Sequence, residues 1–181
     1  MHRVSQKPCD LSRIRLVVTD MDGVWTDGSI YLDDRGIECK RFSAYDGLGV
    51  RLATEAGLRI AILSGRASAV VALRAAALGV ERIVQNSSDK GPDFLKLCQE
   101  MGIPPGQTVY AGDDLPDLAP MALAGAAVAV PNAPADVCRA ADWLTDSPGG
   151  TGAIREIVEW LLREAGRWEE TLARFGTGAR P

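Results

Sequence analysis

The stretch Ile14-Arg15-Leu16-Val17-Val18-Thr19-Asp20-Met21-Asp22-Gly23 indicates both the fold class and the place where chemistry is to be sought. A short apolar run rich in β-branched residues predicts a buried strand, here over 14–20. Two carboxylates two residues apart at its end are a costly placement, because crowded negative charges repel and raise each other's pKa. A cation between Asp20 and Asp22 would offset that cost.

The rest of the chain alternates strand-like and helix-like segments, which predicts an α/β fold with a mostly parallel sheet covered by helices on both faces. The expected strands are 14–20, 58–63, 81–85, 107–111, 126–130 and 141–145. The expected helices are 46–56, 67–78, 89–102, 115–123, 134–140 and a longer terminal helix over 152–173. One segment breaks the alternation: 29–32 and 37–42, joined by a polar turn, predict a short β-hairpin that projects beside the acidic pair as a flap.

Length and composition predict a single domain. The 181 residues are 46 % hydrophobic and 24 % charged, with a net charge of −4, as expected of one ordinary soluble domain with a full core. We expect one domain over 1–181, with its core at about 14–164 and mobile N- and C-terminal tails, including a frayed segment around His2 and a disordered end over 176–181. The chain shows no basic run and no long apolar segment, so we expect neither a nucleic-acid nor a membrane partner, and a cytoplasmic location.

The residue types restrict the chemistry. His2 is the sole histidine, so a serine–histidine triad or a histidine-rich metal site is excluded. The four cysteines, Cys9, Cys39, Cys98 and Cys138, lack zinc-ligand or redox-motif spacing and are expected to be ordinary thiols. Catalysis must therefore use carboxylates, hydroxyls, lysine and arginine.

Four polar clusters follow predicted strands, and ligands of parallel sheets bind beyond the carboxyl ends of the strands. The clusters are Asp20 with Asp22, Ser64-Gly65-Arg66, Lys90, and Gly112-Asp113-Asp114-Leu115-Pro116-Asp117. Together they suit hydrolysis of a phosphate ester. Asp20 would attack phosphorus, while Asp22 would protonate the leaving group and then activate water. Lys90 and the Ser64 hydroxyl would neutralise the phosphoryl oxygens. Asp20, Asp113 and a backbone carbonyl form an all-oxygen site that suits Mg²⁺.

These motifs, in this order, resemble the haloacid-dehalogenase superfamily of phosphatases, whose fold is Rossmann-like. Within it the chain is most similar to the phosphatases of ulosonic acid phosphates, which act on 3-deoxy-manno-octulosonate 8-phosphate or on a nine-carbon ulosonate 9-phosphate. The likeness spans about 14–162. It is carried by Asp-Gly-Val-Trp-Thr-Asp-Gly (22–28), Lys40-Arg41-Phe42, Asp46-Gly47, Ser-Gly-Arg (64–66) and Gly-Asp-Asp-Leu-Pro-Asp (112–117).

The resemblance implies Asp20 as nucleophile, Asp22 as acid and base, and Mg²⁺ held by Asp20, the Asp22 backbone carbonyl and Asp113. It implies that Ser64 and Lys90 bind the transferring phosphate. It also implies that Asp114 and Asp117 do not contact the phosphate but orient the metal ligands or Lys90. It further implies substrate contacts from the sugar acid to a larger set of residues, namely Asp22, Ser43, Ala44, Tyr45, Asp46, Gly47, Arg51, Arg66, Arg74 and Lys90. Members of this type lack a large cap domain and form homotetramers in which a neighbour covers each site.

Two departures bear on the substrate. The eight-carbon enzymes usually carry Arg and Asn where this chain has Tyr45 and Ser43, and Gly-Gly-Arg-Gly where it has Gly149-Gly150-Thr151-Gly152. The Val24-Trp25-Thr26-Asp27 stretch leans toward the nine-carbon enzymes, so the choice of substrate stays open. Ordinary alternatives also stay open: a helix N-cap for Ser64, surface roles for Arg51 and Arg74, and a catalytically silent oligomerisation module or subunit of a larger assembly for the whole chain.

Overall fold

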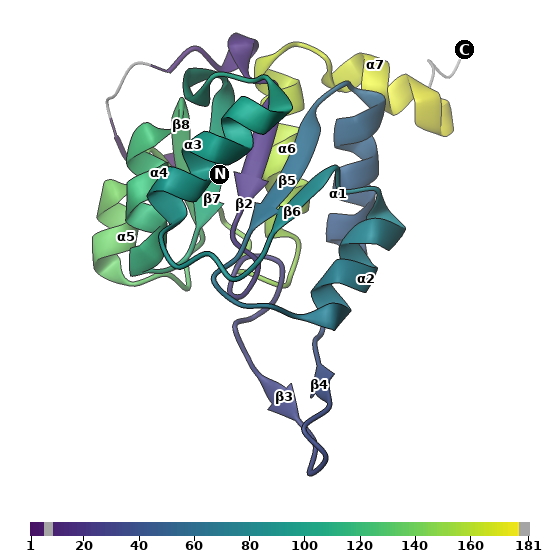
Figure 1. The fold of residues 1–181 in the computed structure, drawn as a ribbon. Coiled ribbons are helices and arrows are strands. Elements are labelled where there is room, and N and C mark those ends of the chain that lie inside the picture. The colour runs from purple at the N-terminus through teal and green to yellow at the C-terminus, as the bar shows by residue number, and fades with distance from the viewer. Residues whose placement is uncertain (6–8, 178–181) are drawn as a thin grey trace.

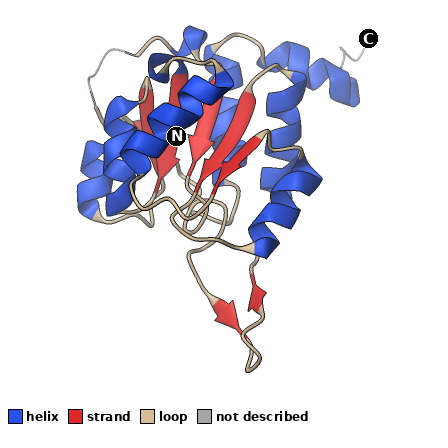
Figure 2. Cartoon of the chain, in the orientation of Figure 1, coloured by secondary structure: helices blue, strands red, loops and turns tan. Residues whose placement is uncertain are grey.

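A seven-stranded sheet occupies the centre of the structure (Figures 1 and 2), a computed structural model that describes residues 1–5 and 9–177. The strand order is β1-β9-β8-β7-β2-β5-β6. All neighbours are parallel except β1 and β9. The strands are β1 (His2–Arg3), β2 (Leu16–Thr19), β5 (Arg59–Leu63), β6 (Arg82–Val84), β7 (Thr108–Gly112), β8 (Ala126–Ala129) and β9 (Trp143–Leu144). The predicted parallel α/β sheet is therefore confirmed.

Helices cover both faces of this sheet. They are α1 (Ala44–Glu55), α2 (Ala69–Leu78), α3 (Lys90–Met101), α4 (Leu118–Leu123), α5 (Ala135–Ala140), α6 (Ala153–Glu164) and α7 (Trp168–Leu172), with short 3₁₀ turns at Leu11–Arg13, Pro105–Gln107 and Leu115–Asp117 and a π-helical turn at Ala173–Thr177. Alternate β2 residues point to opposite faces. Val17 packs in the core formed with α1, α2 and α6, and Val18 in the core formed with α3, α4 and α5.

Local sequence sets where the helices begin and end. Ser43, Ser68 and Asp89 cap α1, α2 and α3 by accepting hydrogen bonds from backbone N–H groups of the first turn. Gly79 and Gly102 end α2 and α3 in the left-handed conformation. The second, two-stranded sheet is the predicted hairpin, β3 (Tyr31–Leu32) with β4 (Glu38–Cys39). It projects away from the body of the molecule beyond the strand ends (Figure 1).

The ends of the chain differ from the sequence expectations in two places. Where we expected a frayed segment around His2, the structure has a short strand: His2–Arg3 pairs antiparallel with β9, and the Arg3 guanidinium lies 5.5 Å from the centroid of the Trp143 ring. The expected helix over 152–173 is broken into α6 and α7, because Gly166 has a φ of +66° and the Arg167 N–H donates back to the Leu162 carbonyl. Of the end that we expected to be disordered, residues 178–181 lie outside the described residues.

Two features bear on expectations about environment. All four cysteines are thiols. Across the described ranges 1–5 and 9–177, no helix has both the length and the apolar character needed to span a membrane.

Candidate active site

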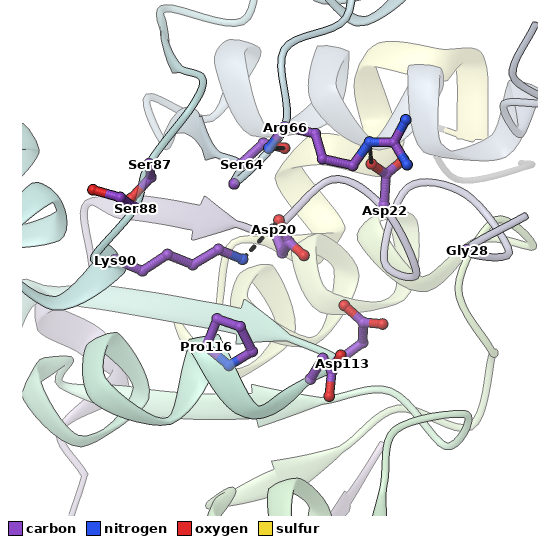
Figure 3. A pocket seen from close by; sticks show the side chains of 12 residues that line it. Asp20, Asp22, Gly28, Ser64, Arg66, Ser87, Ser88, Lys90, Asp113 and Pro116 are labelled. Carbon is purple, nitrogen blue, oxygen red and sulfur yellow. Dashed lines mark hydrogen bonds and ion pairs between the residues drawn. The ribbon is translucent and has the colours of Figure 1, made fainter. Parts of the chain in front are cut away.

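The predicted polar clusters meet in one pocket at the carboxyl edge of the parallel strands (Figure 3). The pocket has a volume of about 370 Å³, within the range typical of small-molecule sites. Lys90 reaches Asp20 from one side, while Asp22 and Arg66 lie together on another (Figure 3). Its lining includes Asp20, Asp22, Gly28, Ser64, Gly65, Arg66, Ser87, Ser88, Lys90, Asp113, Asp114 and Pro116.

Asp20 lies directly beyond β2, the strand between β5 and β7. Its backbone N–H donates to the Ala111 carbonyl at 2.8 Å, which extends the ladder with β7 by one residue. The Asp20 carboxylate oxygen Oδ1 lies 2.9 Å from Lys90 Nζ. Burial raises the pKa of Asp20 to about 6, and Asp117 adds to this effect while Lys90 opposes it. Most Asp20 side chains are therefore ionised at neutral pH, as a nucleophilic carboxylate must be.

Lys90 begins α3 and is buried between two carboxylates. Its Nζ lies 2.9 Å from Asp20 and 2.7 Å from Asp117. Burial disfavours the ammonium charge, but the two carboxylates outweigh that cost and raise the pKa of Lys90. The lysine thus stays a cation beside Asp20, where a transferring phosphoryl group needs one.

Asp117 is fully buried and bonded on both oxygens. Oδ1 accepts from Lys90 Nζ and from the Tyr110 hydroxyl, both at 2.7 Å. Oδ2 accepts from the backbone N–H groups of Asp113 and Asp114 at 3.0 and 3.2 Å. The Asp117 carboxylate lies near those of Asp20 and Asp113, but both of its oxygens are already engaged in these hydrogen bonds. Asp117 therefore positions Lys90 and the turn after β7.

Asp113 has the features of a metal ligand. Its Oδ1 is buried without a hydrogen-bond partner. Burial, with Asp20 and Asp117 nearby, raises its pKa to about 8. A Cβ built on Gly23, whose φ is +92°, would lie 1.9 Å from Asp113 Oδ2, so only glycine leaves room for this carboxylate. The carboxyl groups of Asp20 and Asp113 lie close together and largely buried, so ionising both costs free energy. A divalent cation bound between them would offset that cost. The residues present therefore fit Mg²⁺.

Ser64 and Arg66 follow β5. Ser64 is buried in the pocket wall, and its Oγ accepts from the Arg66 N–H at 3.2 Å. The helix N-cap considered for Ser64 belongs instead to Ser68. Asp114 is exposed and its Oδ1 accepts from the Leu115 N–H at 2.8 Å, so it shapes the turn at the pocket rim.

The other predicted substrate contacts are not in this pocket. Ser43, Ala44 and Tyr45 line a separate surface hollow with Arg41, Phe42, Gly150 and Thr151. The Arg74 guanidinium lies over the Phe42 ring, 5.8 Å from its centroid, and packs close to Gly47.

Two of these predicted contacts have other partners within the chain. The buried Asp46 carboxylate accepts from the Arg155 N–H at 3.0 Å, at the start of α6. Arg51 is exposed on α1, where it pairs with Glu55 at 2.7 Å.

Several residues that shape the site were not identified from sequence. The Tyr110 hydroxyl donates a hydrogen bond to Asp117. From the sequence, the position of Tyr110 in a buried strand predicted only a role in core packing. Asn132 Nδ2 donates to the Gly23 carbonyl at 3.1 Å, and its Oδ1 accepts from the Gly149 N–H at 2.8 Å. Gly149 packs so tightly that an added Cβ would lie 1.7 Å from the Gly23 carbonyl oxygen. The Gly149-Gly150 pair was the sequence signal for this contact, because two backbone segments can approach so closely only where one of them has glycine.

Comparison with known proteins agrees with this geometry. Residues 71–157 match the family model of haloacid dehalogenase-like hydrolases. The chain is 39 % identical over 157 residues to the 3-deoxy-D-manno-octulosonate 8-phosphate phosphatase KdsC of Escherichia coli K12, covering 87 % of this chain and 84 % of that protein. The KdsC of Haemophilus influenzae is 37 % identical, with 87 % of each chain covered.

Solved structures give the same result. The 3-deoxy-D-manno-octulosonate 8-phosphate phosphatase of Moraxella catarrhalis, in complex with magnesium, phosphate and KDO, superposes with a TM-score of 0.88 at 36 % identity, covering 91 % of this chain and 95 % of that one. The cobalt-bound Haemophilus influenzae enzyme gives 0.86 at 34 %, covering 90 % and 98 %. From the fold, the carboxylate–lysine pocket and these relatives together, the chain belongs to the haloacid dehalogenase-like hydrolase family.

Proposed function

We propose that this protein is a Mg²⁺-dependent phosphomonoesterase that removes phosphate from an ulosonic acid phosphate, through an aspartyl-phosphate on Asp20. The observation that carries the proposal is the pocket itself: Asp20 is held 2.9 Å from the buried Lys90 ammonium, with Asp22, Ser64 and Asp113 around it. A phosphoryl group in this pocket meets a nucleophile, a cation, a hydroxyl and a candidate proton donor at once.

The first half-reaction uses Asp20 and Asp22. The Asp20 carboxylate attacks phosphorus while Asp22 gives a proton to the leaving oxygen, which departs as an alcohol. Lys90 and the Ser64 hydroxyl neutralise the charge on the phosphoryl oxygens. In the second half-reaction Asp22 takes a proton from water, which attacks the phosphorus of the aspartyl-phosphate and releases inorganic phosphate. Mg²⁺ would be held by Asp20, Asp113 and the Asp22 backbone carbonyl, and when bound it would supply further charge neutralisation.

An acidic sugar phosphate is supported by the cations at the pocket. Arg66 lines the pocket with a half-exposed guanidinium, the group best suited to bind a carboxylate through two parallel hydrogen bonds. The relatives named as 3-deoxy-D-manno-octulosonate 8-phosphate phosphatases support the eight-carbon substrate. Tyr45 in place of the arginine usual in those enzymes weakens that choice, and the stretch 24–27 favours the nine-carbon substrate. Ser43, Tyr45, Arg51 and Arg74 do not line the pocket, and a second copy of the chain could bring them to the pocket of its neighbour.

We propose that this second copy is a neighbour in a homotetramer. The projecting hairpin exposes the apolar side chains Ile30, Tyr31, Leu32 and Ile37, which is a surface suited to burial against another subunit. Trp160 and Trp168 do not serve this purpose, because both are buried within their own chain. We also propose a cytoplasmic location, which the four thiols support.

Phosphate release tests the function. The panel holds the eight- and nine-carbon ulosonate phosphates, hexose phosphates and 4-nitrophenyl phosphate, each with and without Mg²⁺. We expect Mg²⁺-dependent turnover fastest with one ulosonate phosphate. Release from the aryl phosphate alone would reject the substrate class, and release from none would support a silent oligomerisation module. Light scattering of the same protein tests the tetramer, and a monomeric mass would reject it.

A further inference from the structure

Lys40 is a buried lysine at the base of a projecting hairpin. It directly follows β4, yet its side chain is 0 % exposed. Burying an ammonium is costly unless carboxylates compensate it. Here its Nζ donates to Asp22 Oδ1 and lies 3.3 Å from Glu38 Oε1. The cation of the hairpin base is therefore paired with the proposed proton donor.

These residues form a ring of alternating charges with Arg66. The Arg66 guanidinium lies 3.3 Å from Glu38 Oε1, and its Nε lies 3.9 Å from Asp22 Oδ2. The ring thus runs Lys40, Asp22, Arg66, Glu38 and back to Lys40. The Ser68 hydroxyl donates to the second Glu38 oxygen, which fastens the ring to the start of α2. The ring joins the turn after β2, the loop after β5 and the hairpin base.

The two cations of this ring hold Asp22 in different ways. The Lys40 side chain is fully buried, and its Nζ donates a hydrogen bond to Oδ1. Arg66 is 45 % exposed, lines the pocket, and stands 3.9 Å from Oδ2, which exceeds hydrogen-bond distance. Arg66 therefore faces the space a substrate would enter, whereas the Lys40 side chain is shielded from it. Oδ1 is fixed to the protein, and Oδ2 is the oxygen left for the reaction.

We propose that Lys40 is a positioning residue for the proton donor: its Nζ anchors Asp22 Oδ1 so that Oδ2 faces the leaving group. In that step an Asp20 oxygen bonds to phosphorus. The bond from phosphorus to the leaving oxygen breaks, with its electron pair going to that oxygen. The Oδ2 proton moves to the same oxygen, so the product leaves as a neutral alcohol. This inference rests on the proposed phosphomonoesterase activity.

The test compares leaving groups that differ in their need for a proton. Benzyl phosphate and 4-nitrophenyl phosphate have similar size and charge, but the benzyl alkoxide must be protonated as it leaves, whereas 4-nitrophenolate leaves unaided. The ratio kcat/KM reports the steps up to departure of the leaving group, so it excludes hydrolysis of the aspartyl-phosphate. We compare the native protein with Lys40→Met, which keeps the chain length and removes the charge, using both substrates with Mg²⁺.

The expected result is a selective loss. Because general acid catalysis contributes roughly 10²–10⁴-fold, Lys40→Met should lower kcat/KM for benzyl phosphate at least about tenfold more than for 4-nitrophenyl phosphate. The matched control is Lys96→Met at an exposed position of α3, which should leave both values unchanged. Equal losses with both substrates, or no loss, would refute the role of Lys40.

Two further measurements keep the outcome clear. Thermal unfolding verifies that the variant is folded; if Lys40→Met does not fold, Lys40→Gln, which keeps a hydrogen-bond donor without the charge, is compared in the same way. Failure of the proposed function is a separate result, because in that case the native protein itself would release no phosphate from these two substrates or from the ulosonate phosphates.

Discussion

Mg²⁺ binding should depend steeply on pH, because the metal must displace protons from the carboxylates that bind it. In the metal-free protein burial raises the pKa of Asp113 to about 8 and that of Asp20 to about 6. At pH 6 roughly 1 in 100 Asp113 side chains is ionised, and at pH 8 about half are. The apparent affinity for Mg²⁺ should therefore rise about 50-fold from pH 6 to pH 8 through Asp113 alone, with Asp20 adding in the same direction.

Isothermal titration of the protein with MgCl₂ at pH 6, 7 and 8 measures this change. Repeating the pH 7 titration in two buffers of different ionisation enthalpy counts the protons released, and we expect about one per metal ion. Asp113→Asn should weaken binding and flatten its pH dependence. Asp136→Asn, at an exposed site on α5, should change neither. An affinity that is the same at pH 6 and pH 8 would refute the assignment of Asp113 as a ligand.

Three substitutions test other parts of the site. Asp20→Asn should abolish turnover in a protein that still folds, with a lower melting temperature because Lys90 loses one of its two carboxylate partners; substantial residual phosphate release would contradict the role of Asp20 as nucleophile. Asp117→Asn should lower the free energy of unfolding by about 3 kcal/mol, since it leaves Lys90 with one carboxylate in a buried site. An unchanged midpoint in urea would argue against that ion pair. Gly149→Ala should lower kcat about tenfold or more by pushing the Gly23 carbonyl aside, and native activity would show that the loop yields without harm.

The sequence predicted the sheet and the pocket floor because both rest on short-range patterns. An apolar run followed by Asp20, or by Asp113, marks the end of a buried strand. Parallel pairing then brings those ends to one edge whatever the lengths of the connections. The four strand-end clusters therefore came together as expected, in the pocket that Lys90 and Ser64 also line.

The remainder depends on contacts that no local pattern records. Lys40 stands between Cys39 and Arg41 in the sequence context of a solvated lysine, yet its side chain is buried against Asp22. Asn132 contacts a carbonyl 109 residues away. Asp46 was expected at the substrate but accepts a hydrogen bond from the backbone of α6. The placement of each residue is decided by which loops meet in three dimensions.

The segments that build the site are spread along the chain, so the ribosome makes the first of them long before the last. The strand β2, which directly precedes Asp20, is made before its sheet partners β5 and β7, which come some forty and ninety residues later. The loop that contains Gly150 is made later still. Its Gly150 N–H donates to the Val24 carbonyl at 3.1 Å and so contacts the turn that follows Asp20. Every proposed catalytic side chain has been made by the time Asp117 is added. We therefore expect a chain that ends before Gly149 to carry every proposed catalytic side chain and still be inactive, because the turn after β2 would lack the contacts that hold it.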